Sequence, residues 1–195
     1  MTALSRRLLY FPIIHSLEDL GVAGAKALSA RSEAQAMNQK QIIDDFWGKV
    51  EEAVAGLDLN FTQVRLYQDG LPVCGHESEI VMQLVATGSR NHRLLHALMR
   101  RGGALTGTES GELLVEEYEL LKQTLLPGTE TEPCQQLADA LLRRRDAYMV
   151  ERIHETLLPG ETGILFIGLM HDLAHRLTQR DIEVSFPIGR PTIRA

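Results

Sequence analysis

The strongest strand signal in this sequence is the run Gly163-Ile164-Leu165-Phe166-Ile167-Gly168-Leu169-Met170, and it decides the fold class. The run is continuously apolar, which is typical of a strand buried on both faces of a parallel sheet. A second run of this kind spans residues 8–14, although Pro12 weakens it because proline cannot donate to a sheet ladder. Shorter strands are predicted at residues 61–67, 104–106 and 182–186.

Helical patterns fill the segments between these strands. The clearest is an amphipathic helix whose apolar residues repeat at spacings of three and four. Those residues are Ile42, Ile43, Phe46, Trp47, Val50, Val54 and Leu57. Further helices are predicted at residues 77–86, 90–101 (with Ser89 as N-cap), 111–126 and 135–158, and a short one from His171. Gly21 and Gly24 lead into one more helix, rich in alanine.

Strands separated by helices require crossover connections. The order therefore predicts an α/β fold with a mostly parallel sheet of about five strands, covered by helices on both faces. No change in composition and no linker marks a boundary, so residues 1–195 are expected to form a single domain.

Charge and cysteine content exclude several classes of protein. The formal net charge is −6, which opposes binding to a nucleic acid backbone. The short basic clusters Arg100-Arg101 and Arg143-Arg144-Arg145 are interpreted as solvated helix faces.

Cys74 and Cys134 are too few for a disulfide framework, and we expect two free thiols in a reducing compartment. The apolar run at residues 8–14 is too short for a membrane span, so a cytoplasmic protein without a membrane partner is expected.

Three candidate site residues follow predicted strands directly. His15 follows the strand at residues 8–14, Glu109 follows residues 104–106, and His171 follows the strand that ends at Met170. The carboxyl ends of parallel strands meet at one edge of a sheet, where ligands bind. Two imidazoles and a carboxylate suit either metal coordination or acid–base catalysis. Taken singly, each residue is also consistent with a helix cap or an ordinary surface position. If Glu109 belongs to a strained functional cluster, Glu109→Gln should be neutral or stabilising.

The segment His171-Asp172-Leu173-Ala174-His175 has the spacing of the zincin pattern H-E-x-x-H, with Asp in place of Glu. In that pattern both histidines project from one face of a helix, whereas His171 here ends a strand. We therefore do not expect zincin chemistry, and we expect His175 on an exposed helix face.

Two segments in the C-terminal part of the chain form a further pattern. Arg145-Asp146-Ala147-Tyr148-Met149 lies in a predicted helix, and the strand that follows runs into Gly168-Leu169-Met170-His171. A helix with an Arg-Asp/Asn and Met pattern, followed by a strand that runs into G-x-x-H, resembles the TraB/TIKI superfamily, which includes ChaN-like and erythromycin esterase-like proteins. His15 and Glu109 match an early strand-end histidine and an acidic residue after an inner strand. The resemblance implies an α/β core and, in some members, hydrolase or metalloprotease activity.

Two functions from different classes follow. The first is a small intracellular hydrolase in which His15, Glu109 and His171 act on a bound water, with or without a divalent metal such as Zn²⁺ or Mn²⁺. Its substrate would be a small molecule or a peptide. The second is a non-catalytic binding or assembly protein that forms a homo-oligomer, motivated by the long amphipathic helices at residues 41–57 and 135–158.

Overall fold

The structure is a computed structural model, which describes residues 5–15, 33–124 and 132–190, and in the helix that begins at residue 33 describes side chains only from residue 41. The strands are β1 (Arg6–Ile13), β2 (Val64–Gln68), β3 (Ala104–Thr106), β4 (Thr162–Gly168) and β5 (Ile182–Ser185). The helices are α2 (Glu33–Ala55), the 3-10 turn η2 (Phe61–Gln63), α3 (Glu77–Ala86), α4 (Arg90–Arg100), α5 (Gly111–Thr124), α6 (Glu132–Thr156) and α7 (Ala174–Thr178).

All five strands are parallel and form one sheet in the order β3-β2-β4-β1-β5. The predicted α/β fold with a parallel sheet is therefore confirmed. β4 lies in the middle, between β1 and β2, as its continuous apolar sequence requires. Pro12 pairs in register with Ile167 of β4, beyond Leu9, where the pairing of β1 with β5 ends. A missing N–H is tolerated there because, within the described part of the chain, only β4 pairs with β1 at that level.

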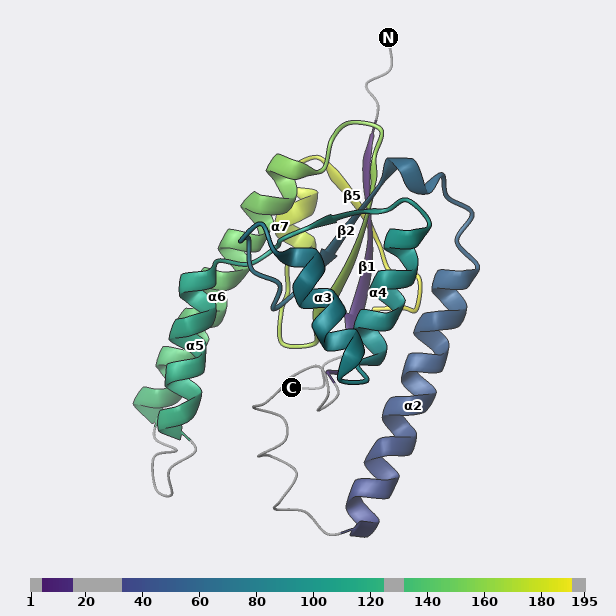
Figure 1. Ribbon diagram of the computed structural model, residues 1–195. Helices are drawn as coiled ribbons and strands as arrows, with labels where there is room; N and C mark the ends of the chain where they lie inside the picture. Colours follow the sequence, from purple (N-terminus) through teal and green to yellow (C-terminus); the bar gives the residue numbers. More distant parts are fainter. Residues whose placement is uncertain (1–4, 16–32, 125–131, 191–195) are drawn as a thin grey trace.

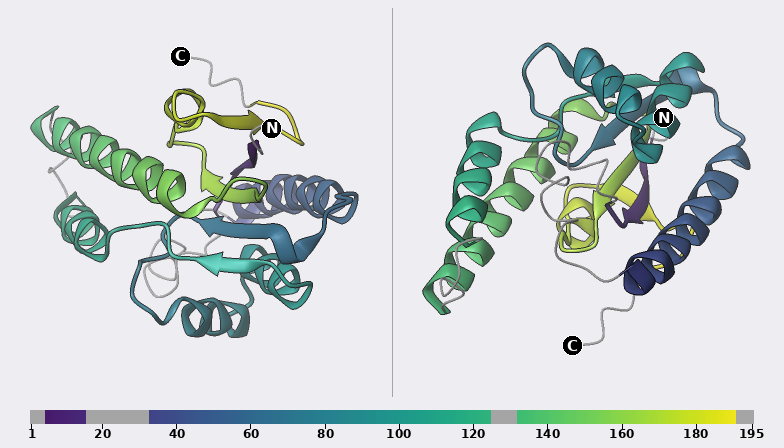
Figure 2. Two further views of the ribbon diagram at one scale, coloured as in Figure 1. Left: turned by 90° about the horizontal axis from the view of Figure 1, so that it is seen from above. Right: turned by 60° about the horizontal axis from the view of Figure 1, so that its bottom comes forward.

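Helices cover both faces of the sheet, as Figures 1 and 2 show. On one face Phe11, Leu66 and Phe166 pack with Trp47 of α2 and Leu95 of α4. On the other face the sheet packs against α6 and α7. The buried residues of that second core include Leu8, Tyr10, Tyr67, Met149, Ile153, Leu165, Ile167 and Leu177. The crossover connections thus place a helical layer on each side, which is the arrangement that a doubly covered parallel sheet needs.

Several local expectations are confirmed in the described residues. Ser89 caps α4, since its side chain accepts a hydrogen bond from the backbone N–H of His92. His175 is exposed, and neither Cys74 nor Cys134 is part of a disulfide. No helix in the described ranges is long and apolar enough to cross a membrane.

Other expectations need correction. Residues 61–63 form a 3-10 turn, capped by Asn60, and the strand begins only at Val64. The last helix begins at Ala174 and not at His171, because the chain turns after β4 before it can enter a helix. Ile42 lies outside the buried stripe of α2, with 56% of its surface exposed. The predicted helix after Gly21 and Gly24 lies outside the described residues.

The basic cluster on α6 is also not uniformly solvated. Arg143 and Arg144 are exposed, but Arg145 is only 6% exposed. One residue along a helix turns a side chain by about 100°, so three consecutive arginines cannot all face the solvent. The interpretation of this cluster as a solvated face is therefore wrong for Arg145.

Candidate functional site

Three polar side chains meet at the carboxyl ends of the neighbouring strands β1, β4 and β2. His15 follows β1, His171 follows β4, and Asp69 follows β2 directly. Nε2 of His15 lies 3.0 Å from Oδ2 of Asp69, and Nε2 of His171 lies 4.0 Å from the same oxygen. The sheet thus brings the two predicted histidines together, and the carboxylate between them joins the candidate site.

Asp69 is a buried carboxylate that accepts hydrogen bonds from several donors. Its Oδ2 accepts from the backbone N–H of Gly168 at 2.7 Å and from His15, and its Oδ1 accepts from Nε2 of Gln68 at 2.8 Å. Burial alone raises the pKa of this carboxyl. The hydrogen bond and charge of His15, the charge of His171 and the Gly168 N–H outweigh burial, so the pKa of Asp69 lies below its ordinary value. Asp69 therefore carries a negative charge at neutral pH.

Gly168 is required where it stands because the site lies directly against it. A Cβ atom at this position would lie 2.9 Å from Nε2 of His15 and 3.0 Å from Oδ2 of Asp69. Both distances are shorter than ordinary van der Waals contacts. The absence of a side chain at the end of β4 lets both groups approach the backbone.

His171 is held in place from its other ring nitrogen. Its Nδ1 lies 2.6 Å from Oδ1 of Asp146 on α6, and only 5% of its side chain is exposed. A carboxylate can only accept, so this pair requires a proton on Nδ1 of His171 and turns Nε2 toward Asp69. The hydroxyl of Tyr10 donates to the carbonyl oxygen of His171 at 3.3 Å. Burial raises the pKa of the Tyr10 phenol well above its ordinary value, so that hydroxyl keeps its proton.

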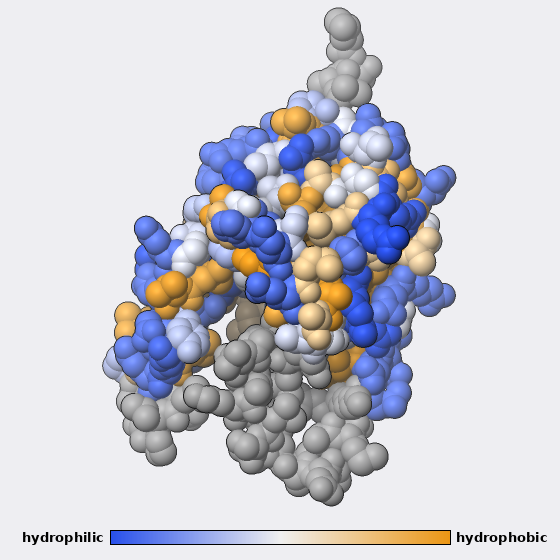
Figure 3. Space-filling view, viewed as in Figure 1, coloured by the Kyte–Doolittle hydropathy of each residue, from blue (hydrophilic) through white to orange (hydrophobic). Residues whose placement is uncertain are grey.

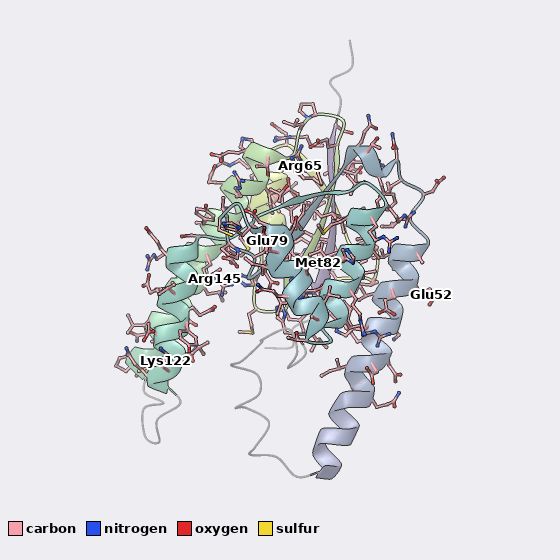
Figure 4. The ribbon with its side chains drawn as sticks, viewed as in Figure 1. Glu52, Arg65, Glu79, Met82, Lys122 and Arg145 are labelled. Carbon is pink, nitrogen blue, oxygen red and sulfur yellow. The ribbon has the colours of Figure 1, made fainter. Side chains whose placement is uncertain are left out.

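Glu109 is also buried near this edge, but an arginine occupies its carboxylate. Nη2 and Nε of Arg145 donate to its two oxygens at 2.6 and 3.2 Å, and the backbone N–H of Gly70 donates to Oε1 at 3.2 Å. Arg145 also donates to Glu117 of α5. Figure 4 labels Arg145 at the end of the α5–α6 pair that lies nearest the sheet. Glu109 thus acts as the partner of a buried cation.

Sequence reasoning missed Asp69 and Asp146. Asp69 follows a strand directly, as His15 and Glu109 nearly do, but the dipeptide Asp69-Gly70 also has the composition of an ordinary turn. The strand-end rule applied to β2 would have found it. Asp146 lies in the middle of a helix, and no spacing rule connects it to His171. Arg145 and Asp146 are consecutive residues of the motif that carries the resemblance, and that motif is their only sequence signal.

The donor set does not form a metal centre as it is arranged. Among the described residues, no three His, Cys, Asp or Glu side chains are positioned to hold a metal ion. His15 and Asp69 bond to each other directly, and Glu109 is bonded to Arg145. The expected ligand set of His15, Glu109 and His171 is therefore not assembled, and a Zn²⁺ or Mn²⁺ site stays a prediction.

A pocket of about 420 Å³, which includes space open to solvent, lies beside His171. Its lining residues are Tyr10, Pro12, Leu169, His171, Asp172, Phe186 and Arg190. Apolar side chains share its walls with the ionisable side chains of His171, Asp172 and Arg190. The pocket is therefore a mixed apolar and charged hollow beside the histidine.

Comparisons of the chain with protein-family models, with curated proteins and with solved structures found no match. The resemblance to the TraB/TIKI superfamily therefore stays an expectation based on the two motifs.

Proposed function

We propose that this protein is a hydrolase that activates water by acid–base catalysis with His171, Asp69 and His15. The observation that carries the proposal is the pair formed by Nδ1 of His171 and Oδ1 of Asp146, 2.6 Å apart. A buried imidazole oriented by a carboxylate is the usual arrangement of a general base.

His171 is the proposed base. With its proton on Nδ1, Nε2 is free to accept a proton from water. The negative charge of Asp69, 4.0 Å from that nitrogen, stabilises the imidazolium that forms. The water oxygen then bonds to the electrophilic carbon or phosphorus of the substrate as its proton moves to Nε2.

His15 is the proposed acid. It is hydrogen-bonded to Asp69, and 31% of its side chain is exposed, so a substrate reaches it more easily than the buried His171. It supplies a proton to the leaving group when the bond to that group breaks. The proton taken up by His171 balances this loss. Two imidazoles on one carboxylate therefore suit the two proton transfers of a hydrolysis.

Glu109 and Arg145 support this site. Arg145 holds Glu109, whose Oε1 accepts from Gly70, the residue after Asp69. Arg145 also precedes Asp146 in α6. The ion pair therefore holds the backbone next to Asp69 and the backbone next to Asp146. In this proposal Glu109 is a positioning residue and not a metal ligand.

The proposal is tested by turnover of ester, amide and phosphoester substrates by the purified protein, with and without added Zn²⁺, Mn²⁺ or Co²⁺. The expected result is metal-independent turnover that falls at least about 100-fold in His171→Gln, since general acid–base catalysis typically contributes 10²–10⁴-fold. His175→Gln is the matched control, because His175 is exposed and its Nε2 contacts Nε2 of Gln179, the C-cap residue of α7.

Two results contradict the proposal. One is the absence of turnover across the whole panel. The other is turnover that is kept in His171→Gln. Turnover that appears only with added metal would favour the metal-dependent hydrolase and would contradict the metal-free mechanism.

A further inference from the structure

Helix α4 has a solvent-facing side and a side that faces the sheet. Arg93 and Arg100 are exposed, and Figure 3 shows hydrophilic residues on the solvent-facing side of this helix. Leu95 and Leu98 are at most 1% exposed and pack in the core that covers one face of the sheet. Asn91 precedes Leu95 by one turn and therefore lies on the same, buried side of the helix.

Asn91 is a fully buried amide in the first turn of α4. The usual reason for an asparagine at a helix start is capping, but Ser89 already caps this helix. Both polar atoms of the Asn91 side chain, Nδ2 and Oδ1, have no hydrogen-bond partner among the described residues. A buried amide without a partner lowers the stability of a protein, so such a group normally binds something.

Gln68, the last residue of β2, carries a third atom of this kind. Its Nε2 donates to Oδ1 of Asp69 at 2.8 Å, and a carboxylate can only accept, so the Gln68 amide cannot be turned over. Oε1 of Gln68 is buried and has no hydrogen-bond partner in the part of the chain that the structure describes. The central carboxylate of the candidate site is thus held by an amide whose own acceptor is unpaired.

The fold brings Gln68 and Asn91 to the same place. Leu66 of β2 points into the core beneath α4, and side chains two residues apart on a strand share a face, so Gln68 points there too. A Cβ atom on Gly103 would lie 2.9 Å from Cδ1 of Leu66 and 3.2 Å from the carbonyl oxygen of Leu98, so these two residues are adjacent. Asn91 lies about 10 Å before Leu98 along the helix, and Gln68 lies about 7 Å after Leu66 along the strand. Both displacements lead to the carboxyl end of the sheet, where α4 begins (Figure 1).

We propose that Gln68 and Asn91 bind one enclosed water molecule, through which Asn91 holds Gln68 and, with it, Asp69. The water donates to Oε1 of Gln68 and bonds to the amide of Asn91, which offers both a donor and an acceptor. Both side chains are at most 1% exposed, which suits a water and not a larger ligand. An anion would meet two acceptor oxygens, and a cation is disfavoured by the positive end of the α4 dipole.

In the hydrolase proposed above, Asn91 is then a positioning residue for Asp69. That role rests on the proposed function, whereas the water site does not. Asn91 contacts neither substrate nor reacting atoms and acts through the water and Gln68. Outer partners that orient a site in this way typically contribute about 10–100-fold to activity.

Asn91→Leu distinguishes a bridged amide from an unpaired one, because leucine has nearly the same volume and no polar atom. If the Asn91 amide is unpaired, leucine removes a buried polar group and raises the urea midpoint of unfolding. If the water bridge is present, leucine leaves Oε1 of Gln68 without its partner, and the midpoint falls. We expect a fall. Leu95→Ala is the matched control, since it loses stability by leaving a cavity on the same side of α4 and keeps the bridge.

NMR measures the bridge directly. The side-chain amide protons of wild-type Asn91 are expected to show a cross-relaxation peak with long-lived water. The backbone N–H of Gly168 donates to Oδ2 of Asp69 at 2.7 Å, so its exchange with solvent reports on that carboxylate. In Asn91→Leu this exchange should accelerate at least about 10-fold more than that of Ile164, in the middle of the same strand. In Leu95→Ala the two rates should change alike.

Turnover tests the positioning role. The kcat of Asn91→Leu should fall about 10-fold with KM unchanged, and Asn91→Ser, whose hydroxyl donates and accepts, should recover most of it. Absence of turnover in the wild type would contradict the hydrolase, while the urea and NMR measurements still decide the bridge. A raised urea midpoint in Asn91→Leu, no water contact at Asn91, or equal exchange changes at Gly168 and Ile164 would overturn the bridge. An active wild type whose kcat is unchanged in Asn91→Leu would overturn the positioning role.

Discussion

Oδ1 of Asp146 lies 2.6 Å from Nδ1 of His171, although the two residues come from a helix and from the loop after a strand. This contact orients a buried imidazole at the edge of the sheet. It also decides which ring nitrogen carries the proton, and the first prediction follows from it.

Asp146→Asn should change the tautomer of His171. The wild type is expected to hold the proton on Nδ1, because the carboxylate can only accept there. An asparagine amide can instead donate to Nδ1, which moves the proton to Nε2 and removes the proposed base. ¹⁵N-detected NMR of the labelled protein near pH 8 distinguishes the two tautomers. The same tautomer in both proteins would contradict the orienting role of Asp146.

Gly168→Ala should lower the free energy of unfolding, whereas Gly48→Ala should raise it. At position 168 a Cβ would lie 2.9 Å from His15 and 3.0 Å from Asp69, so the side chains of the site must move apart. We expect a loss of about 1–3 kcal/mol in the free energy of unfolding. At position 48, within α2, a Cβ meets nothing within 4 Å, and alanine should stabilise the helix by about 0.5–1 kcal/mol. Urea denaturation measures both. Equal effects would mean that Gly168 has no special role at the site.

Replacing only one partner of the Glu109–Arg145 ion pair should lower the free energy of unfolding strongly. Arg145→Met leaves the fully buried Glu109 without its cation and is expected to cost about 3–5 kcal/mol in the free energy of unfolding. The double variant Arg145→Met/Glu109→Gln should lose clearly less than the sum of the single changes. Glu109→Gln alone should now destabilise, in contrast to the expectation drawn from the sequence, because Arg145 then keeps an incomplete partner.

Arg144→Met is the matched control for that pair. Arg144 also forms an ion pair with a glutamate of α5, Glu116, but both side chains are at least half exposed. We expect a loss below about 1 kcal/mol, since water screens such pairs. Equal losses in the free energy of unfolding for Arg144→Met and Arg145→Met would mean that burial does not set the strength of the Glu109 pair. A loss in the double variant Arg145→Met/Glu109→Gln that equals the sum of the two single losses would mean the same.

Trp47→Ala should cost about 3–5 kcal/mol in the free energy of unfolding, the usual range for removal of a large buried aromatic side chain. Trp47 is 1% exposed, and its Nε1 donates to the carbonyl oxygen of Ile14 at 3.2 Å. Trp47→Phe keeps most of the packing and should lose much less. Ile42→Ala, at an exposed position of the same helix, should change stability by less than about 0.5 kcal/mol. A loss below about 1 kcal/mol for Trp47→Ala would contradict its burial.

Asp69 should contribute to stability in a way that depends on pH. Its folded pKa is below its ordinary value, so the contribution is present above the unfolded pKa of about 3.9 and is lost as the pH falls through the folded pKa. Below about pH 4 the free energy of unfolding should therefore fall more steeply with decreasing pH in the wild type than in Asp69→Asn. Guanidinium melts between about pH 2.5 and 6 measure the two slopes. Parallel curves would mean that the carboxylate is not stabilised in its charged form.

The sequence by itself determined the α/β class and most of the elements. The apolar run of β4 has no polar alternation, so it had to be buried on both faces, and helical patterns on each side required crossovers. His15 and His171 were also identifiable, because any polar residue that ends a parallel strand lies at the same edge of the sheet. These properties depend on local periodicity and on the direction of the strands.

Only the tertiary structure decided what each charged group contacts. Glu109 follows a strand as the histidines do, yet Arg145 reaches it from α6 and turns a candidate ligand into half of a buried ion pair. Asp146 reaches His171 from the same helix, and no local pattern records that approach. Partner choice depends on how a helix is rotated and placed against the sheet, and that placement is set by the packing of the whole core. A strand end can therefore be predicted from the chain, whereas the partner of a buried charge cannot.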